Sequence, residues 1–195
     1  MKRTIASVII AAMIAAPICG YAEQNWYTEP EFPVVQTIAE PIPVSVEELE
    51  RQRAVAEAEQ YLSQKGIEVP EYITDICERV GTEYGIEPEL LEAIGWKESR
   101  YDSTAVSGTN KGICQVSTYW HADRMTRLGV TDIFDPEQNI RVAADLLAEL
   151  SESYDSTERV LMAYNGDHRK TVSKYATEVV TIADKLRTVH GKGEN

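Results

Sequence analysis

Glu98 and two later segments of the chain contain side chains that could act together as a general acid and its neighbours. Glu98 stands at the end of a strongly helical segment. Residues 112–115 read Gly-Ile-Cys-Gln, and residues 163–166 read Ala-Tyr-Asn-Gly. In this order they predict one carboxylic acid at the base of a groove, with Gln115 and Tyr164 facing it. One such acid can protonate the leaving oxygen of a glycosidic bond.

The surroundings of Glu98 favour a functional role over that of an ordinary surface residue. Most helical glutamates are solvated. The helix before Glu98 is instead apolar on more than one face, through Leu90, Leu91 and Ile94, and a loop rich in glycine and serine follows it. A carboxyl group placed where a buried helix opens to a cleft is partly desolvated, which raises its pKa. An acid that must hold its proton near neutral pH needs such a shift.

Other catalytic chemistries find little support in the sequence. The three histidines, His121, His168 and His190, share no metal-ligand spacing with cysteines or acids. There is no His-Glu-x-x-His motif, no Gly-x-Ser-x-Gly motif and no phosphate-binding glycine loop. Cys114 with His121 or His168 would form a thiol hydrolase dyad, but no cysteine-protease signature surrounds Cys114. We therefore predict neither a metal nor a cofactor.

The cysteines leave two alternatives open. Cys19 lies in a predicted export signal, which leaves Cys77 and Cys114. In an oxidising compartment an even pair suggests a disulfide, which would stabilise the fold by about 3–4 kcal/mol. Two buried thiols that pack as small apolar residues are the equally favoured alternative.

The chain is acidic, with 19 Lys+Arg against 32 Asp+Glu and a net charge of −13. Loss of the export signal removes Lys2 and Arg3 and no acid, which moves the charge to −15. This balance argues against nucleic acid, which requires a basic face, and against anionic membranes. A polysaccharide remains compatible, because sugars are recognised mainly by hydrogen bonds and stacking.

The N-terminus predicts a signal peptide over residues 1–22. Lys2 and Arg3 precede an uncharged apolar run over residues 5–18, and small residues follow at the cleavage positions. A membrane anchor is the alternative, but the run is too short to span a bilayer comfortably. We expect no stable membrane span after cleavage, and a secreted protein located in a periplasm or cell wall.

Two appendages precede the main domain. Residues 23–44 contain four prolines and scattered acids and predict a proline-rich, acidic linker. Residues 45–66 predict a charged spacer helix that begins with a capping box at Ser45 and Glu48. The helix could stand alone, or pack on the domain or on a partner. Residues 23–66 are thus the candidate attachment to a cell-envelope machinery.

Residues 70–189 predict an all-α domain, with at most a short hairpin in the loop over residues 100–116. Apolar residues recur at three- and four-residue steps throughout this region. The predicted helices run from Pro70 to Gly85, from Pro88 to about Ser99, from a cap at Ser117 to Leu128, from Asp135-Pro136, from Ser156, and from about Val172 to Val189.

With these pieces in order, residues 70 to about 185 resemble the soluble lytic transglycosylase (SLT) domain, a lysozyme-like helical fold that acts on peptidoglycan. The matching motifs are Glu98-Ser99, Ser107, Gly112-Ile113-Cys114-Gln115, Asn139-Ile140 and Ala163-Tyr164-Asn165. The chain departs from the family in a shorter loop before Gln115 and in Cys114, where Met or Phe is common. These departures affect the substrate contacts more than the acid.

The resemblance implies a role for each residue. Glu98 would be the catalytic acid and then the base, while Ser107 and Gln115 would contact the sugars of peptidoglycan glycan strands. Tyr164 would position Glu98 or the substrate. Asn165 belongs to the same substrate-binding set, with a structural role as its alternative.

The product depends on whether a second carboxylate faces Glu98. With one acid, the resemblance implies a lytic transglycosylase that forms 1,6-anhydroMurNAc at the MurNAc–GlcNAc β-1,4 bond. If Asp102 or another acid faced Glu98, the reaction would be hydrolysis, as in goose-type lysozymes; a turn role for Asp102 is favoured. A non-catalytic peptidoglycan-binding or scaffold protein of the same fold is the third alternative.

Three aromatic residues flank the motifs, namely Tyr101, Tyr119 and Trp120. They could stack on sugar rings in the groove. Packing of the small core around the loop is an equally favoured interpretation.

Overall fold

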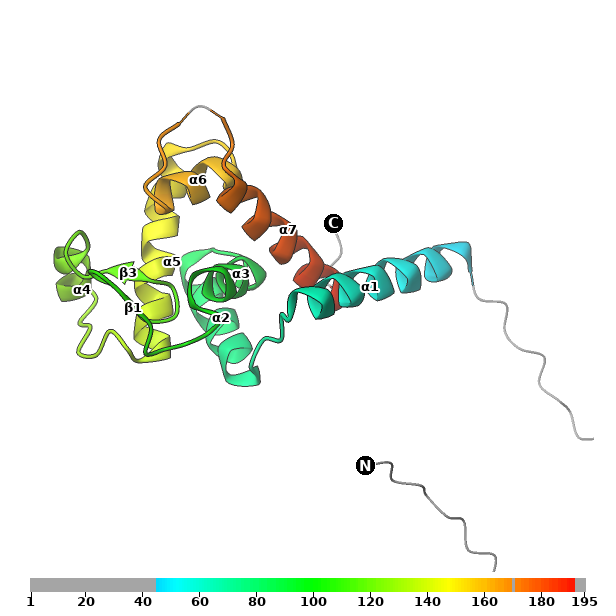
Figure 1. The fold of residues 1–195 in the computed structure, drawn as a ribbon, viewed down its shortest axis with the longest axis horizontal. Helices are drawn as coiled ribbons and strands as arrows, with labels where there is room; N and C mark the ends of the chain where they lie inside the picture. The colour runs from blue at the N-terminus through cyan, green and yellow to red at the C-terminus, as the bar shows by residue number, and fades with distance from the viewer. Residues whose placement is uncertain (1–44, 170, 192–195) are drawn as a thin grey trace, which may run out of the picture. The chain divides into compact units, whose positions relative to one another are not determined.

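The computed structural model describes residues 45–169 and 171–191. The predicted signal peptide (1–22) and linker (23–44) lie outside these residues. The described chain forms an all-α domain with a small sheet, as the sequence predicts (Figure 1). Its elements are α1 (Val46–Lys65), α2 (Glu71–Tyr84), α3 (Pro88–Ser99), β1 (Val106–Ser107), β2 (Asn110–Lys111), β3 (Val116–Ser117), α4 (Ala122–Arg127), α5 (Pro136–Ser153), α6 (Thr157–Tyr164) and α7 (Lys174–Val189).

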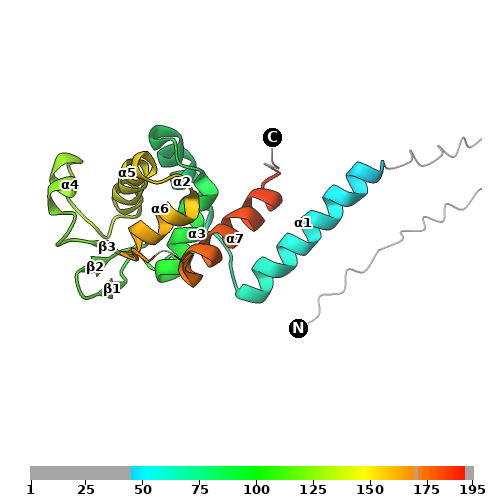
Figure 2. The ribbon, with the colours of Figure 1, turned by 90° about the horizontal axis from the view of Figure 1, so that it is seen from above.

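The central helix of the domain is α3. It packs against α2, α5 and α7, and Figures 1 and 2 place it between α5 and α7. Pro88 occupies its first turn, where the missing N–H has no helical partner to lose. Leu90, Leu91 and Ile94 are all buried, so the helix is apolar on more than one face as predicted, and Glu89 and Glu92 are buried with them. Burial of each large aliphatic side chain contributes about 1.5–3 kcal/mol, which fixes the helix that carries Glu98.

The surrounding helices begin where capping side chains stand. Asp135 and Ser156 accept hydrogen bonds from backbone N–H groups at the starts of α5 and α6, as the sequence predicts. Ser173 caps α7, so that helix begins at Lys174 rather than at Val172. Each cap satisfies a backbone donor that the helix leaves free.

Helix α1 is only partly attached to the domain. Ser45 caps it, with its Oγ 3.1 Å from the Glu48 nitrogen. The second half packs on α7 and buries Ala58 and Leu62, whereas almost all of the first half is exposed (Figure 2). Of the alternatives for residues 45–66, packing on the domain therefore holds for the C-terminal half.

The loop after α3 forms a three-stranded sheet, where the sequence predicts at most a two-stranded hairpin. Strands β1, β2 and β3 form an antiparallel sheet in that order, with Val106 opposite Lys111 and Lys111 opposite Val116. A left-handed Gly112 (φ 75°) and Gln115 (φ 48°) turn the chain back between β2 and β3. The third strand was not predicted, because a two-residue strand has no detectable period in sequence.

Ser117 does not cap a helix, which corrects the predicted start of α4. Ser117 belongs to β3, and its Oγ lies 3.1 Å from the Thr109 Oγ and 3.3 Å from the Trp120 nitrogen. Residues 118–121 form a turn, and α4 begins at Ala122. The serine is thus used to fix the turn to the sheet.

Helix α4 has no buried residue and is held by charge. Arg124 and Arg127 both pair with Asp145 of α5, and the Arg127 Nη2 lies 2.6 Å from an Asp145 carboxylate oxygen. The Arg124 Nη2 also lies 2.7 Å from Glu149. The two guanidinium groups hold the pKa of Asp145 below its usual range. This ionic network supplements the partly buried Met125, which packs against the core from α4.

Cys77 and Cys114 are both buried and both free thiols in the structure. This arrangement matches the alternative of two core thiols and not the disulfide. Burial raises the pKa of each thiol, so neither is an ionised nucleophile at neutral pH. None of the helices described is long and apolar enough to cross a membrane.

Candidate active site

Glu98 lies in the last turn of α3, half-buried at the wall of a pocket. The hydroxyl of Tyr175, in the first turn of α7, donates a hydrogen bond to the Glu98 Oε1 at 2.6 Å. Burial raises the pKa of Glu98, while the Tyr175 hydrogen bond and the charge of Lys97 oppose the rise. The net shift is upward, as a general acid requires.

The Lys97 ammonium group is itself paired. It contacts the Glu178 carboxylate of α7, and both side chains are partly buried. Lys97 is therefore engaged one residue from Glu98, which limits how strongly it can hold Glu98 ionised.

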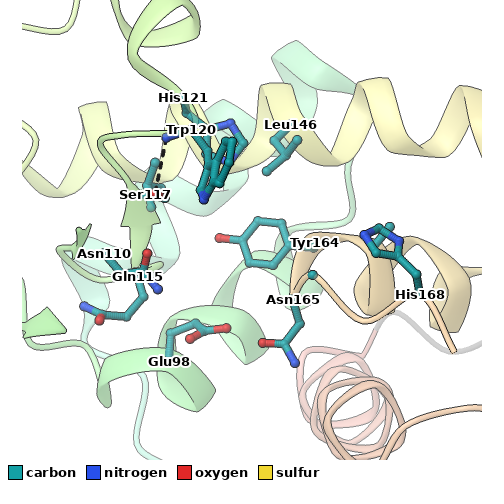
Figure 3. Close-up of a pocket in the computed structure, with 13 residues that line it drawn as sticks. Glu98, Asn110, Gln115, Ser117, Trp120, His121, Leu146, Tyr164, Asn165 and His168 are labelled. Carbon is teal, nitrogen blue, oxygen red and sulfur yellow. Dashed lines mark hydrogen bonds between the residues drawn. The ribbon is translucent and has the colours of Figure 1, made fainter. Parts of the chain in front are cut away.

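The pocket beside Glu98, here called the Glu98 pocket, has a volume of about 450 Å³. Its walls come from α3, the sheet, the turn before α4, α5, and the end of α6 with the loop after it (Figure 3). The lining residues are Glu98, Asn110, Gln115, Val116, Ser117, Trp120, His121, Leu146, Ala163, Tyr164, Asn165, Gly166 and His168. Among these described residues Glu98 is the one carboxylate.

Asp102 has the turn role that the sequence favours. Its Oδ1 accepts hydrogen bonds from the Thr104 nitrogen at 2.8 Å and from the Thr104 hydroxyl at 2.7 Å. The residue is exposed and does not line the Glu98 pocket. It is not placed to activate water on the far side of a sugar.

The loop over residues 112–115 is fixed from two sides. Asn139 is buried; its Oδ1 accepts from the Cys114 nitrogen at 2.8 Å, and its Nδ2 donates to the carbonyls of Lys111 and Ile133, each at 2.9 Å. A methyl group at Gly112 would overlap the Asn139 amide, so only glycine fits there. These contacts give Asn139 a structural role, because they fix the backbone of the loop.

The loop also contacts the end of α3 directly. Ser99 donates from its Oγ to the carbonyl of Ile113 at 2.9 Å. Gly95 permits this approach, since a Cβ there would lie 2.9 Å from the Ile113 side chain. Glu98 and the loop that carries Gln115 are therefore held as one unit.

Gln115 lines the Glu98 pocket as predicted. Its left-handed backbone (φ 48°) is a conformation that non-glycine residues seldom adopt. The Nε2 group donates to the carbonyls of Gly112 at 2.9 Å and Ala105 at 3.2 Å, which holds the side chain toward its own loop. A strained backbone conformation of this kind costs free energy, and such conformations are found mainly at functional sites, where the surrounding structure holds them in place.

Tyr164 lines the pocket but does not bond Glu98. Its hydroxyl donates to the carbonyl of Cys114 at 2.7 Å, and burial raises its pKa well above the usual value. Tyr164 therefore supports the Gln115 loop from the opposite wall, and Tyr175 bonds the acid. In the sequence Tyr175 begins the apolar stripe of Val179, Ile182 and Leu186 on α7, which indicates that it is buried but not that it contacts Glu98.

With this geometry established, comparison with known proteins identifies the fold. A family model described as "Transglycosylase SLT domain" matches residues 75–181, more than half of the chain. The chain belongs to the transglycosylase SLT domain family. The predicted family resemblance is thereby confirmed, together with the lysozyme-like helical fold class.

Three relatives show the range of proteins that contain a similar segment. This SLT domain protein is 33% identical over 132 residues to an "X polypeptide" of Escherichia coli, covering 60% of this chain and 78% of the relative. It is 30% identical over 117 residues to "Protein IpgF" of Shigella flexneri, covering 54% and 76%. A third match, 37% over 91 residues, is to "Membrane-bound lytic murein transglycosylase F 1" of Alkalilimnicola ehrlichii, covering 44% of this chain and 18% of that one.

The SLT domain does not bring all the predicted residues together. Asn165 is exposed, follows the last turn of α6 and lines the Glu98 pocket. Ser107 is exposed on β1 and is not among the lining residues; Asn110 and Ser117 on the neighbouring strands line the pocket instead. The sheet explains the difference, because the sequence predicts at most a short hairpin here and not its register, so the strand side chains could not be assigned to a face.

Within residues 45–169 and 171–191, no three or more His, Cys, Asp or Glu side chains are grouped so that they could hold a metal ion. His121 and His168 both line the Glu98 pocket. Burial lowers the pKa of His121, so it is mainly neutral at neutral pH and can exchange hydrogen bonds with an uncharged ligand.

Proposed function

We propose that this protein is a peptidoglycan lytic transglycosylase, which cleaves the MurNAc–GlcNAc β-1,4 bond and forms 1,6-anhydroMurNAc. Membership of the SLT family supports a transglycosylase-like enzyme acting on peptidoglycan. The observation that carries the finer proposal is the single carboxylate of the Glu98 pocket, half-buried and hydrogen-bonded by Tyr175. Hydrolysis by two carboxylates would need a second acid across the sugar, a position that Asp102 does not occupy.

In the first step Glu98 acts as the general acid. Tyr175 occupies Oε1, which leaves Oε2 to carry the proton. This proton passes to the glycosidic oxygen as the bond to the anomeric carbon of MurNAc breaks. The acetamido oxygen of the same sugar can stabilise the positive charge at that carbon. Burial of Glu98 keeps the carboxyl protonated to a higher pH than it would be in water.

In the second step the same group acts as the base. The Glu98 carboxylate takes the proton of the MurNAc C6 hydroxyl while the O6 atom attacks the anomeric carbon. The proton that Glu98 gave to the leaving oxygen is thus replaced, and no water is consumed. The Tyr175 hydroxyl stays protonated, since burial raises its pKa, and so donates to the carboxylate throughout.

We propose further that the protein acts outside the cytoplasm. The predicted signal peptide over residues 1–22 supports export to a periplasm or cell wall. Residues 23–66 are the proposed attachment to a cell-envelope partner, and the exposed first half of α1 would be available for it.

The test is digestion of purified peptidoglycan by the wild type and by Glu98→Gln. We expect the substitution to lower the rate of solubilisation by about 10²–10⁴-fold, the usual contribution of a general acid. Asp102→Asn is the matched control, because it changes a nearby exposed carboxylate outside the pocket and should leave the rate unchanged. Undiminished cleavage by Glu98→Gln would contradict the role proposed for Glu98.

A further inference from the structure

Helix α7 contacts two consecutive residues of α3, the acid Glu98 and the cation Lys97 before it. Tyr175 donates a hydrogen bond to Glu98 at 2.6 Å, and the Glu178 carboxylate binds the Lys97 ammonium group. Tyr175 and Glu178 stand three residues apart on α7, so one face of that helix presents both side chains to α3. The acid and the neighbouring cation therefore have separate partners on the same helix.

The Lys97–Glu178 ion pair is only partly exposed, with 28% and 31% of the two side chains accessible. Water and salt screen such a pair less than an exposed one. The hydrogen bond from Lys97 holds the pKa of Glu178 below its usual range, so Glu178 is ionised at neutral pH. Lys174 lies 3.6 Å from the other Glu178 oxygen, but 89% of its side chain is exposed. Lys97 is thus the main partner of Glu178.

The other titratable groups that act on Glu98 are neutral at neutral pH. Burial raises the pKa of Tyr175 on α7, of Tyr164 on α6 and of Cys114 in the loop before β3. Among the described residues, Lys97 is the cation whose charge favours the ionised form of Glu98. The charge beside the acid is therefore set by how well Lys97 is compensated.

We propose that Glu178 is a positioning residue of the proposed reaction, which binds the Lys97 ammonium group and so neutralises the positive charge beside the acid. The inference rests on the proposed function and adds a residue that acts on its acid. Glu178 does not line the Glu98 pocket, so it acts through Lys97 and not on the substrate. Without Glu178, an unpaired ammonium group one residue from Glu98 would favour loss of the proton that the first step needs.

A purely structural ion pair between α3 and α7 is the competing explanation. In that case removal of either partner would loosen the same contact, and both variants would change the activity in the same direction. Charge compensation predicts opposite directions instead. Loss of Glu178 leaves a cation beside Glu98, whereas loss of the Lys97 charge leaves an anion there.

Peptidoglycan solubilisation, measured as a pH–rate profile, distinguishes the two explanations. Glu178→Gln should move the alkaline limb to lower pH, with a rate on that limb about threefold or more below the wild type. Lys97→Met should move the limb to higher pH, and the double variant should return it close to the wild-type position. All three variants retain His121 and His168, so any titration of these two pocket residues is common to the profiles.

Glu83→Gln is the matched control. It removes the carboxylate partner of Arg141 in an ion pair that joins α2 to α5, outside the Glu98 pocket. Its alkaline limb should coincide with that of the wild type. Displacement of the limb in the same direction by Glu178→Gln and Lys97→Met, or by neither variant, would overturn the role proposed for Glu178.

A titration of Glu98 itself gives a readout that does not depend on cleavage. The ¹³C NMR signal of its carboxyl carbon can be assigned as the one that Glu98→Gln lacks. Glu178→Gln should lower the midpoint of this titration, and Lys97→Met should raise it. Unchanged midpoints would overturn the proposal. Midpoints that move as expected in a protein that does not cleave peptidoglycan would overturn the proposed function and leave the effect of Glu178 on Glu98 standing.

Discussion

Tyr175 determines which oxygen of Glu98 is free to carry the proton in the proposed mechanism. Its hydroxyl bonds Oε1 at 2.6 Å from a helix 77 residues further along the chain. Donation to the ionised carboxyl also lowers the pKa of Glu98, against the larger effect of burial. Tyr175 is thus a positioning residue with a measurable electrostatic effect.

Replacing Tyr175 by phenylalanine should change both the rate and its pH dependence. Loss of the hydrogen bond lets the pKa of Glu98 rise further, so the alkaline limb of the pH–rate profile should move to higher pH. The rate at the optimum should fall about tenfold or more, because the acid loses its fixed orientation. A pH–rate profile for peptidoglycan solubilisation measures both.

Tyr164→Phe is the control for this change. It also removes a buried phenol hydroxyl, but one that bonds the Cys114 carbonyl. Its alkaline limb should coincide with that of the wild type. A shift as large as that of Tyr175→Phe would show that the hydroxyl contacts of Glu98 are not as described.

The raised pKa of Glu98 also predicts how stability varies with pH. In the folded state Glu98 binds its proton more tightly than in the unfolded chain, so its contribution to folding declines as pH rises from the unfolded pKa, about 4.5, through the folded value. Glu98→Gln carries no charge to desolvate. Its Tm should exceed that of the wild type at pH 7, with the difference shrinking toward pH 4.

Thermal unfolding followed by circular dichroism at the two pH values tests this linkage. Asp102→Asn is again a suitable comparison, because hydrogen bonds from Thr104 lower the pKa of Asp102. That variant should lose stability at pH 7 relative to pH 4. A Tm gain of Glu98→Gln that is equal at both pH values would exclude desolvation as its cause.

The sequence predicts Glu98 itself better than it predicts the residues that contact Glu98. Glu98 and Gln115 could be identified because each lies in a short local motif. Tyr175 could not, since its contact with Glu98 depends on how α7 packs on α3. Ser107 was predicted to contact sugars, but strand register places it outside the pocket lining.

Among the elements, the loop between α3 and α4 depends on one buried side chain. Asn139 bonds Cys114, Lys111 and Ile133 at once, from the first turn of α5. The glycine at position 112 is required for that amide to fit. The hydrogen bonds of Asn139 therefore fix the loop that carries Gln115 to α5.

Asn139→Ala should destabilise the protein and impair the site together. It leaves backbone groups without their partner, at a cost of about 1–3 kcal/mol. Urea unfolding should show the loss, and KM should rise because the Gln115 loop is released. Gln138→Ala, which removes exposed hydrogen bonds to residues 131 and 132, is the neighbouring control and should cost less. Equal losses for the two variants would contradict a central role for Asn139.

Helix starts were predictable where a cap or proline marks them, as at Ser45, Pro88, Asp135 and Ser156. The start of α4 was predicted wrongly at Ser117, because a serine can cap a helix or bond a neighbouring strand with the same hydroxyl. The third strand was missed for the related reason that pairing between segments, not local preference, forms it.

On the scale of the whole molecule, an acidic chain surrounds a pocket whose lining includes a single carboxylate. The core is built around α3, so the acid stands on the most deeply packed helix of the domain. The sheet and α4 lie at one end of this unit and α1 extends from the other (Figures 1 and 2). Within the described residues, the exposed first half of α1 and the Glu98 pocket are therefore separate parts of the domain.

In the proposed mechanism Glu98 works without a partner carboxylate and without water. Digestion of purified peptidoglycan in ¹⁸O-labelled water, followed by mass spectrometry of the soluble products, tests it most directly. We expect MurNAc ends that are lighter than reducing ends by one water and contain no ¹⁸O from the cleavage. Reducing MurNAc ends that carry ¹⁸O would contradict it and establish a hydrolase.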